Sequence, residues 1–230
     1  MRNKKISCLL STYNNQDTIE DAIKSILSQT YENLEFLIID DASTDETLKI
    51  CKSVNDPRVS VYENKYNLGL TKSLNKIARI SMGSYLARQD GDDQSLPHRF
   101  EAQIEQFNNS NEIDIVTCRA FIKSTDKVIP KLRNKINHKL LINFLNPFIH
   151  GTLMIKRDSF YKLNGYDENF VYAQDYKLFH DAIKSGMKIE TIEKPMYVLN
   201  LENNISSNKK KEQKYYSNCV RNNLIPKVKL

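Results

Sequence analysis

The sequence predicts an α/β fold in which one mostly parallel central sheet carries helices on both of its faces. The first observation behind this prediction is a set of short apolar runs without polar alternation, typical of strands buried on both faces. The second is that segments with apolar residues at helical spacing separate these runs. Because strand and helix alternate, we expect right-handed crossovers, a parallel sheet, and ligands bound beyond the carboxyl ends of the strands.

The elements of the first half follow in a regular order. Strands are predicted over 6–11, 34–39, 59–62, 84–88 and 113–118. Helices are predicted over 15–28 and 70–80, after a capping box at 43–46, and after Pro97. This order places the strand ends of the first half at one edge of the predicted sheet.

Past residue 120 the pattern is weaker. It predicts a hairpin near 125–126, a helix over 135–145, a strand over 152–155 and an amphipathic helix from Asp175 to about Gly186. Beyond residue 202 Asn, Ser and Lys predominate, which is typical of a solvated or disordered segment. We therefore expect one domain over 1–202, with halves 1–120 and 121–202, followed by a basic tail over 203–230.

Composition excludes several classes of protein. The chain has 230 residues, a net charge of +6, four cysteines and no tryptophan. No apolar run approaches the roughly 18 to 20 residues needed to cross a bilayer, and the run after the charged N-terminus is too short for a signal peptide. The cysteines lie far apart, so neither a zinc site nor a disulfide framework is indicated. A cytoplasmic protein fits these features best.

The charge is unevenly distributed. Residues 1–120 carry −4 and residues 121–230 carry +10, of which +6 lies in 203–230. In this tail, the candidates for contact with anionic lipid headgroups at the inner face of the plasma membrane are Lys209, Lys210, Lys211 and Lys214. The alternative is a solvated, disordered end. We expect no nucleic-acid binding, because stacking aromatic residues do not interleave with the basic ones.

Acidic residues gather at two predicted strand ends. Asp40 and Asp41 close the second strand, and Asp90, Asp92 and Asp93 follow the fourth. Carboxylates this close repel one another unless a cation lies between them. Hard oxygen ligands suit Mg²⁺ or Mn²⁺ that bridges to a substrate diphosphate. The alternative is a polar turn that precedes the next helix.

The loop after the first strand lacks the glycines of the common nucleotide-binding motifs. Neither Gly-x-Gly-x-x-Gly nor a Gly-Lys-Ser/Thr run occurs in the chain. In the sequence 11–15 that stands there instead, Tyr13 could stack on a base, while Asp41 could accept a hydrogen bond from a base or ribose. The alternative is a turn that caps the following helix.

A series of motifs carries a resemblance to a known family. They are STYN at 11–14, IIDDASTD at 38–45, NLGL at 67–70, ARQDGDD at 87–93, LPHRF at 96–100, HGTLM at 150–154, NGYD at 164–167 and DYKL at 175–178. In this order and spacing, over about residues 5 to 200, the chain strongly resembles family 2 glycosyltransferases. The resemblance implies the A-type glycosyltransferase fold, which binds a nucleotide-sugar with a divalent metal, Mn²⁺ or Mg²⁺.

The resemblance also implies roles for single residues. Ser11, Tyr13 and Asp41 would contact the nucleoside, Asp92 would hold the metal, and Asp90 would lie beside the sugar or ribose. We therefore expect a donor site made of Ser11, Tyr13, Asp40, Asp41, Lys72 and Asp90, and a metal site made of Asp90 and Asp92. Lys72 is placed near the pyrophosphate; the alternative for it is a solvated lysine on a helix surface.

Asp175 matches the general base of the family. In that role it takes the proton from an acceptor hydroxyl that attacks the anomeric carbon, while the metal neutralises charge on the leaving diphosphate. One displacement inverts configuration, and the local alternative is a helix N-cap carboxylate. His150 is the second catalytic candidate, since it could reach the diphosphate or the acceptor; the alternative is a structural histidine.

Two positions depart from the family pattern. The acidic pair at the start of the catalytic helix is Gln174-Asp175, so one carboxylate remains for the base role. Where many relatives have Tyr-Arg followed by a His, this chain has no cationic side chain between Tyr197 and Glu202. That loop therefore has no cation for a diphosphate contact.

These features together predict a metal-dependent inverting hexosyltransferase that uses UDP-hexose or UDP-N-acetylhexosamine. The expected acceptor is a glycan or lipid-linked hydroxyl in bacterial surface polysaccharide synthesis, in a pocket completed by a partner or a homodimer. One alternative, suggested by Gln174 and Asn200, is a non-catalytic nucleotide-sugar-binding domain. Another is a sugar-1-phosphate nucleotidyltransferase, which would need a glycine-rich loop with a basic residue after the first strand.

Overall fold

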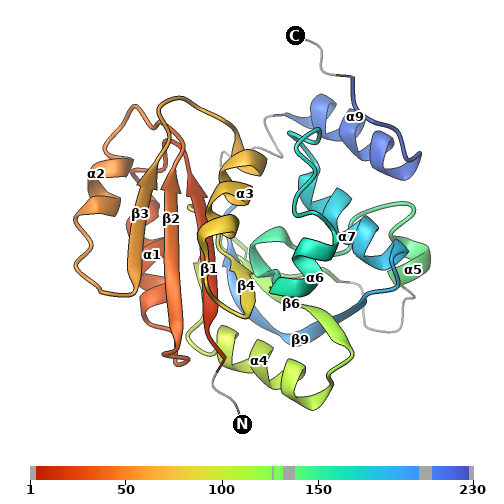
Figure 1. The fold of residues 1–230 in the computed structure, drawn as a ribbon, viewed down its shortest axis with the longest axis horizontal. Helices are drawn as coiled ribbons and strands as arrows, with labels where there is room; N and C mark the ends of the chain where they lie inside the picture. Colours follow the sequence, from red (N-terminus) through yellow and green to blue (C-terminus); the bar gives the residue numbers. More distant parts are fainter. Residues whose placement is uncertain (1–3, 126, 132–137, 202–208, 228–230) are drawn as a thin grey trace.

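The computed structural model describes residues 4–125, 127–131, 138–201 and 209–227. Within them nine strands form one sheet in the order β3-β2-β1-β4-β8-β6-β9-β5, with β7 paired to β6 (Figure 1). The strands are β1 (Ile6–Thr12), β2 (Leu34–Asp40), β3 (Val59–Glu63), β4 (Tyr85–Arg88), β5 (Gln94–Ser95), β6 (Ile113–Ile122), β7 (Val128–Ile129), β8 (Met154–Lys156) and β9 (Lys188–Leu199). The helices are α1 (Ile19–Leu27), α2 (Thr47–Lys52), α3 (Leu70–Ile80), α4 (Arg99–Asn109), α5 (His138–Leu141), the 3-10 helix η1 (His150–Thr152), α6 (Arg157–Lys162), α7 (Gln174–Lys184) and α9 (Lys210–Arg221).

Parallel pairing dominates the first half of the sheet. β1 pairs in parallel with β2 and β4, β2 with β3, and β6 with β9. β8 is antiparallel to both of its neighbours, and the short strands β5 and β7 are antiparallel to theirs. The predicted α/β fold with a mostly parallel sheet is confirmed. Because β1, β2 and β4 run in one direction, their carboxyl ends meet at one edge of the sheet.

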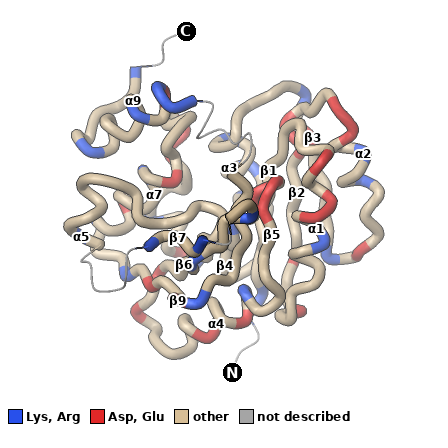
Figure 2. The backbone as a smooth tube through the Cα atoms, turned by 180° about the vertical axis from the view of Figure 1, so that it is seen from behind, with Lys and Arg blue, Asp and Glu red and all other residues tan. Residues whose placement is uncertain are grey.

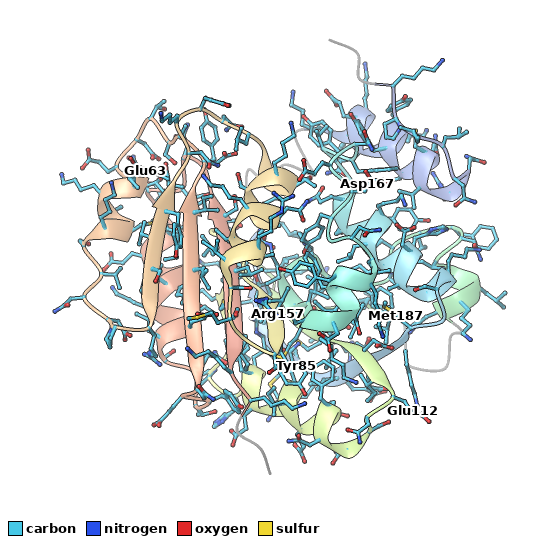
Figure 3. The ribbon with its side chains drawn as sticks, viewed as in Figure 1. Glu63, Tyr85, Glu112, Arg157, Asp167 and Met187 are labelled. Carbon is cyan, nitrogen blue, oxygen red and sulfur yellow. The ribbon has the colours of Figure 1, made fainter. Side chains whose placement is uncertain are left out.

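Helices cover both faces of the sheet, as predicted (Figure 1). α3, α6 and α7 share one hydrophobic cluster with the sheet, and α1, α2 and α4 share another. On β1, Leu9 belongs to the first cluster, whereas Cys8 and Leu10 belong to the second. Both faces of this strand are buried, which explains why its sequence shows no polar alternation. Side chains fill the space between the sheet and α3, α6 and α7 (Figure 3).

The start of α2 differs from the prediction. α2 begins at Thr47, and its N-cap residue Glu46 makes no side-chain cap hydrogen bond. The Ser43 hydroxyl accepts a hydrogen bond at 3.0 Å from the backbone N–H of Asn14, in the loop after β1. The predicted capping box at 43–46 is therefore wrong, because a contact with a distant loop uses the side chain that would cap the helix.

The second half contains elements that the sequence did not predict. Among them are α6 and the long strand β9. β9 fully buries only Met196 and Tyr197, so its sequence shows neither an apolar run nor a regular alternation. The hairpin expected near 125–126 corresponds to the antiparallel pair β6 and β7, and Asp126 lies outside the described residues. Of the helix expected over 135–145, the structure describes α5, and 132–137 lie outside the described residues.

The C-terminal segment is an ordered part of the fold where the structure describes it. α9 packs beside α7 and buries Tyr216, Cys219 and Val220 in the same cluster as α3 and α7. The Tyr216 ring lies 6.1 Å from that of Phe170 and 5.6 Å from that of Tyr172, between ring centroids. The expected solvated segment is therefore wrong for 210–221, because three apolar residues at helical spacing give α9 a buried face. Residues 202–208 and 228–230 lie outside the described residues.

Surface features complete the description of the fold. None of the described helices has the length and apolar character needed to cross a membrane. The four cysteines are free and buried. Figure 2 shows acidic positions beside the labels of β1 and β5 and basic positions along α9. The uneven charge of the sequence thus becomes a spatial separation between one edge of the sheet and the C-terminal helix.

Candidate functional site

The loops after β1 and β2 interlock at the carboxyl edge of the sheet. The backbone N–H of Thr44 donates to Asn14 Oδ1 at 2.8 Å, and the N–H of Asn15 donates to Thr47 Oγ1 at 2.8 Å. Ser11 is buried at the end of β1, whereas the Tyr13 side chain remains 46% exposed. The ring of Tyr13 is therefore accessible for stacking, as predicted from the sequence, and its contact with a nucleoside stays a prediction.

The two acids at the end of β2 are both engaged with the chain. The carboxylate of Asp41 accepts hydrogen bonds from Asn64 Nδ2 at 2.7 Å, from Ser73 Oγ at 3.0 Å, and from the N–H groups of Leu68 and Gly69 at 2.9 and 2.8 Å. These bonds hold the turn before α3.

Asp40 differs from its neighbour. It is buried, and one of its carboxylate oxygens accepts from the Ser43 N–H at 2.9 Å. The other oxygen has no partner among the described residues. The charge of Asp40 contributes to a raised pKa of the Cys51 thiol, behind the larger effect of burial. Asp40 therefore faces the side of the sheet that α2 covers. Donor contacts by Asp40 and Asp41 stay predictions.

The acidic turn after β4 has a defined shape. The buried amide of Gln89 donates to the carbonyls of Asp90 at 3.0 Å and Asp93 at 2.9 Å. The Thr18 hydroxyl, next to α1, donates to the carbonyl of Gly91 at 3.0 Å. Hydrogen bonds from the Gln89 side chain and from Thr18 therefore fix the backbone of the turn.

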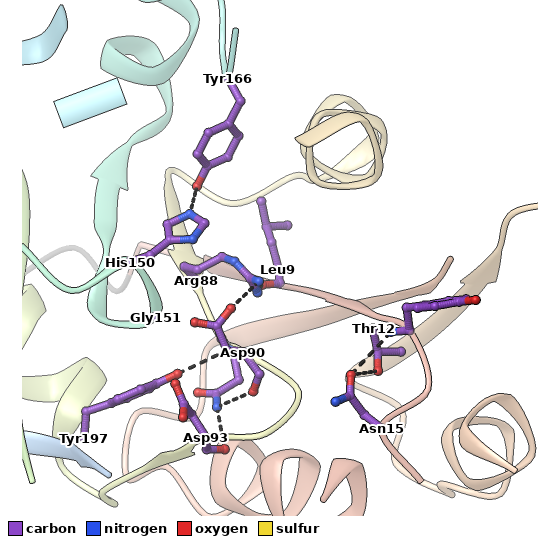
Figure 4. A network of polar contacts seen from close by, with 12 residues as sticks. Leu9, Thr12, Asn15, Arg88, Asp90, Asp93, His150, Gly151, Tyr166 and Tyr197 are labelled. Carbon is purple, nitrogen blue, oxygen red and sulfur yellow. Dashed lines mark hydrogen bonds and ion pairs between the residues drawn. The ribbon is translucent and has the colours of Figure 1, made fainter. Parts of the chain in front are cut away.

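The three carboxylates of this turn have different environments. Asp90 pairs with the guanidinium of Arg88 (Figure 4). Asp93 is buried, accepts from the N–H of Asn200 at 2.7 Å and hydrogen bonds with Tyr197, while burial and the charges of Asp90 and Asp92 raise its pKa. Burial and the charge of Asp90 raise the pKa of Asp92 to about 6. Asp93 thus anchors the turn to the end of β9.

Asp90 and Asp92 fit a divalent cation. The repulsion that raises the pKa of Asp92 is relieved when a cation binds beside it. Among the described residues, no group of three His, Cys, Asp or Glu side chains could by itself hold a metal ion. Two carboxylates leave coordination positions for water and substrate oxygens, which is how Mg²⁺ usually binds in phosphate sites.

Two buried arginines lie beneath the acidic turn. Arg88 donates to the Leu9 carbonyl at 3.1 Å, linking β4 to β1. Arg99, fully buried, donates to the carbonyls of Gly151 at 2.6 Å and Arg88 at 3.0 Å. The sequence interpretation assigned neither arginine a role. A signal was present, because Arg99 lies at i, i+4 spacing with Gln103 on the buried face of α4.

His150 begins the 3-10 helix η1 and hydrogen bonds through its ring. Its Nε2 is 2.8 Å from the hydroxyl of Tyr166 (Figure 4). Burial lowers the pKa of His150 and the charge of Arg88 adds to this, whereas Asp90 and Asp175 act in the opposite direction. The segment that leads to His150 is also linked to Asp175, because Asn146 donates to Asp175 at 2.7 Å and accepts from the Phe148 N–H at 3.1 Å.

The backbone next to His150 approaches the acidic turn closely. A Cβ on Gly151 would lie 2.2 Å from the Tyr197 hydroxyl oxygen and 2.8 Å from Asp90 Oδ2. Only glycine fits at this position. The close approach brings η1, the end of β9 and the acidic turn together.

Asp175 lies in the first turn of α7. The N-cap residue is Ala173, in the left-handed conformation with φ of 53°, and it makes no side-chain cap bond. Asp175 accepts a hydrogen bond from Asn146 Nδ2 at 2.7 Å. The alternative of an N-cap carboxylate is therefore not supported. Asp175 also lines a cavity of about 350 Å³ to which α9 contributes one wall.

Two expectations remain untested by this geometry. Lys72 is exposed in the first turn of α3, and among the described residues it forms no ion pair. Its contact with a pyrophosphate stays a prediction. A partner or homodimer was expected to complete the acceptor pocket; here α9 of the same chain supplies a wall, and the homodimer stays a prediction.

Comparison with known proteins identifies several relatives. Residues 7–164 match the sequence model of "Glycosyl transferase family 2". The Escherichia coli UDP-Glc:alpha-D-GlcNAc-diphosphoundecaprenol beta-1,3-glucosyltransferase WfaP is 27% identical over 220 residues, which cover 94% of this chain and 85% of WfaP. The "Putative glycosyltransferase EpsE" of Bacillus subtilis and an uncharacterized glycosyltransferase of Haemophilus influenzae are 34% and 32% identical to this chain. The chain spans only 60% and 61% of the length of these two relatives.

Solved structures share the fold. S. aureus TarS 1–349 in complex with UDP superposes with a TM-score of 0.77 at 19% identity, over 94% of this chain and 64% of TarS. The Pyrobaculum calidifontis mannosyltransferase PcManGT in complex with GDP-Man and Mn²⁺ superposes with a TM-score of 0.73 at 19% identity, over 94% and 62% of the two chains. At these identities the likeness concerns the fold.

The different hydrogen bonding of Asp40 and Asp41 predicts different effects of the same substitution. Asp41→Asn should lower the free energy of unfolding by about 2–4 kcal/mol. Both carboxylate oxygens of Asp41 accept hydrogen bonds, and the NH2 group of Asn would replace one of these acceptors with a donor that faces another donor. Asp40→Asn should change it by less than about 1 kcal/mol, since its amide oxygen can still accept from Ser43. Urea unfolding of both variants measures the difference, and equal losses would contradict the assigned contacts.

Proposed function

The chain belongs to glycosyl transferase family 2, and on this premise we propose that it is an inverting glycosyltransferase that uses a nucleotide-sugar donor. The observation that carries the proposal is that the segment 146–151 contacts both acids: Asn146 donates to Asp175, and the backbone at Gly151 closely approaches Asp90 Oδ2. One half supplies carboxylates at the edge of the parallel strands, and the other supplies an acid at a helix start beside a cavity. A donor and an acceptor can therefore meet at one point.

Asp90 and Asp92 are the proposed metal-holding residues, with Mn²⁺ or Mg²⁺ as the ion. When bound, the ion neutralises negative charge on the departing nucleoside diphosphate. Arg88 keeps Asp90 in place, and the amide of Gln89 holds the backbone of the turn on which both acids lie. The Mn²⁺ in the complex of PcManGT supports this choice of ion.

Asp175 is the proposed general base. Asn146 donates to one of its carboxylate oxygens and orients the group, which leaves the other oxygen to take the proton of an acceptor hydroxyl. The hydroxyl oxygen then attacks the anomeric carbon from the face opposite the leaving diphosphate, so configuration inverts and no protein nucleophile is needed. His150, held by Tyr166, is the proposed contact to the diphosphate or acceptor.

We assign the donor site to the β1 and β2 loops, with UDP-hexose or UDP-N-acetylhexosamine as the donor. Tyr13 is exposed and can stack on the base, and Ser11 lies at the end of the same strand. Lys72, exposed at the start of α3, is the proposed pyrophosphate contact. The printed name of WfaP, with UDP-Glc and a diphosphoundecaprenol acceptor, supports a UDP donor and a glycan or lipid-linked acceptor in bacterial surface polysaccharide synthesis.

We further propose that the protein contacts a membrane surface through α9. Lys209, Lys210 and Lys211 are exposed at the start of this helix, in the stretch with Lys214 that the sequence indicated. Large exposed apolar side chains lie at its other end, where Ile225 is 74% exposed. Basic and apolar groups together suit an anionic lipid surface.

Removing the proposed base should stop transfer without affecting donor binding. We expect Asp175→Asn to lower sugar transfer by a factor of about 10² to 10⁴, because an amide cannot take the hydroxyl proton. Donor affinity, measured by calorimetry, should remain that of the unmodified chain. The matched control is Asp181→Asn, on the same helix but paired with Lys177, and it should retain turnover. Full turnover by Asp175→Asn would exclude it as the base.

Metal removal should weaken donor binding through Asp92. In the presence of Mn²⁺, Asp92→Asn should weaken nucleotide-sugar binding by about tenfold or more, because one anionic ligand of the cation is lost. In EDTA both proteins should bind the donor equally weakly by calorimetry. Asp21→Asn, which changes an exposed carboxylate on α1, is the control and should bind normally. Donor binding and turnover that do not change in EDTA would contradict metal dependence.

The membrane proposal predicts a charge-dependent association. Sedimentation with phosphatidylserine vesicles should decrease when Lys209, Lys210 and Lys211 are all replaced by Gln, since each basic residue near the surface contributes about 1 kcal/mol. A charge-matched control replaces three exposed lysines of the β6 and β7 region, Lys123, Lys127 and Lys131. Equal sedimentation of the α9 variant and the unmodified chain would rule out this surface.

A further inference from the structure

The cavity beside Asp175 has features that the proposed reaction at Asp175 does not itself explain. Three segments far apart in the sequence line it: the loop after α5, the start of α7, and α9. Its volume of about 350 Å³ lies within the range of small-molecule sites, about 300 to 1,000 Å³. Because Asp175 lies on its wall, a molecule bound in it is next to the proposed base.

The charges of the cavity do not suit a neutral sugar alone. Lys214 and Arg221 line it from α9, opposite the carboxylate of Asp175. Among the described residues neither cation forms an ion pair with a carboxylate; Arg221 instead donates to the carbonyl of Phe144 at 3.0 Å and to Asn218. Two cations against one acid leave the cavity with positive charge.

Neutral hydrogen-bonding groups accompany the two cations. Ser217 and Gln213 line the same side of the cavity, on the same helix. A hydroxyl, an amide, an ammonium and a guanidinium together form a set of donors for phosphoryl oxygens. A sugar hydroxyl needs no such excess of positive donors.

An apolar edge borders the cavity. Phe144 and Leu145 line it, and their side chains are 69% and 42% exposed. Arg221 of α9 donates a hydrogen bond to the Phe144 carbonyl, which connects the backbone of this edge to α9. The edge is therefore held beside the cations, where an apolar chain attached to a phosphoryl group would lie.

We propose that this cavity is the acceptor subsite and that it binds a phosphoryl or diphosphoryl group of the acceptor through Lys214 and Arg221. The proposal rests on the proposed transferase function, since it takes Asp175 as the base. The acceptor hydroxyl then lies on the Asp175 side of the cavity and the phosphoryl group on the α9 side. The phosphoryl group belongs either to a lipid-linked sugar or to a soluble sugar phosphate.

A fluorescence titration tests the proposal without turnover. The chain has no tryptophan, so Phe144→Trp places a single reporter at the exposed edge of the cavity. The probes are inorganic pyrophosphate, decyl diphosphate and the neutral decyl glucoside, each below its micelle concentration. EDTA in the buffer prevents a metal-bound probe at Asp90 and Asp92. We expect saturable binding of both diphosphates, weakened by salt, and no binding of decyl glucoside at the same concentrations.

A matched pair of variants locates the binding. In the Phe144→Trp background, Lys214→Gln should weaken diphosphate binding by about tenfold. Lys184→Gln removes the same charge at the far end of α7 from Asp175, at an exposed residue that does not line the cavity, and should bind as the parent does. Circular dichroism confirms that both variants fold. Unchanged binding by Lys214→Gln, or decyl glucoside binding as tightly as decyl diphosphate, would overturn the proposal.

The probes also distinguish the source of the phosphoryl group. Tighter binding of decyl diphosphate than of pyrophosphate identifies a lipid-linked acceptor, and equal binding identifies a soluble sugar phosphate. Failure of this titration leaves donor binding and the effect of Asp175→Asn untouched. Failure of the proposed transfer reaction, in turn, leaves the titration intact, so the two outcomes are separable.

Discussion

The buried guanidinium of Arg99 joins the parts of the molecule that make up the site. Such a charge costs several kcal/mol to remove from water unless polar groups compensate. Two carbonyls, those of Gly151 and Arg88, accept its hydrogen bonds. The ring centroids of Phe100 and Tyr197 lie 4.6 and 5.2 Å from its Cζ atom. One carbonyl belongs to η1 and the other to β4. The guanidinium therefore holds the strand before the acidic turn against the 3-10 helix that carries His150.

This arrangement gives each acid of the turn a separate role. Arg88, itself held by β1, pairs with Asp90. Asp93 is turned inward and connects the turn to β9. Burial and the charge of Asp90 raise the pKa of Asp92 to about 6, and a cation bound between these two acids would relieve their repulsion. The close approach of Gly151 then keeps the acceptor half against this turn.

α9 packs against the rest of the fold and lines the cavity beside Asp175. Its residues looked like a solvated basic end, yet Tyr216 and its neighbours pack in the core cluster that also contains residues of α3 and α7. The packed helix turns Lys214 and Arg221 toward the cavity at Asp175. Burial on one face of α9 thus aligns cations on another face with the candidate base, which connects packing directly to substrate choice.

Local patterns were sufficient to predict most of the strands and helices in the first half of the fold. The strand over 6–11 and the helix over 70–80 match β1 and α3, since each carries its own periodic signal. The sequence by itself determined which strand ends bear acidic groups, because parallel strands bring those ends to one edge. Only the tertiary structure decided which acid is committed to the fold, as Asp41 is by residues 64 to 73. It also placed the end of β9 against the acidic turn and α9 beside Asp175. The physical reason is that a carboxylate's role depends on its hydrogen-bond partners, and here those partners come from elements tens of residues away, which no local pattern specifies.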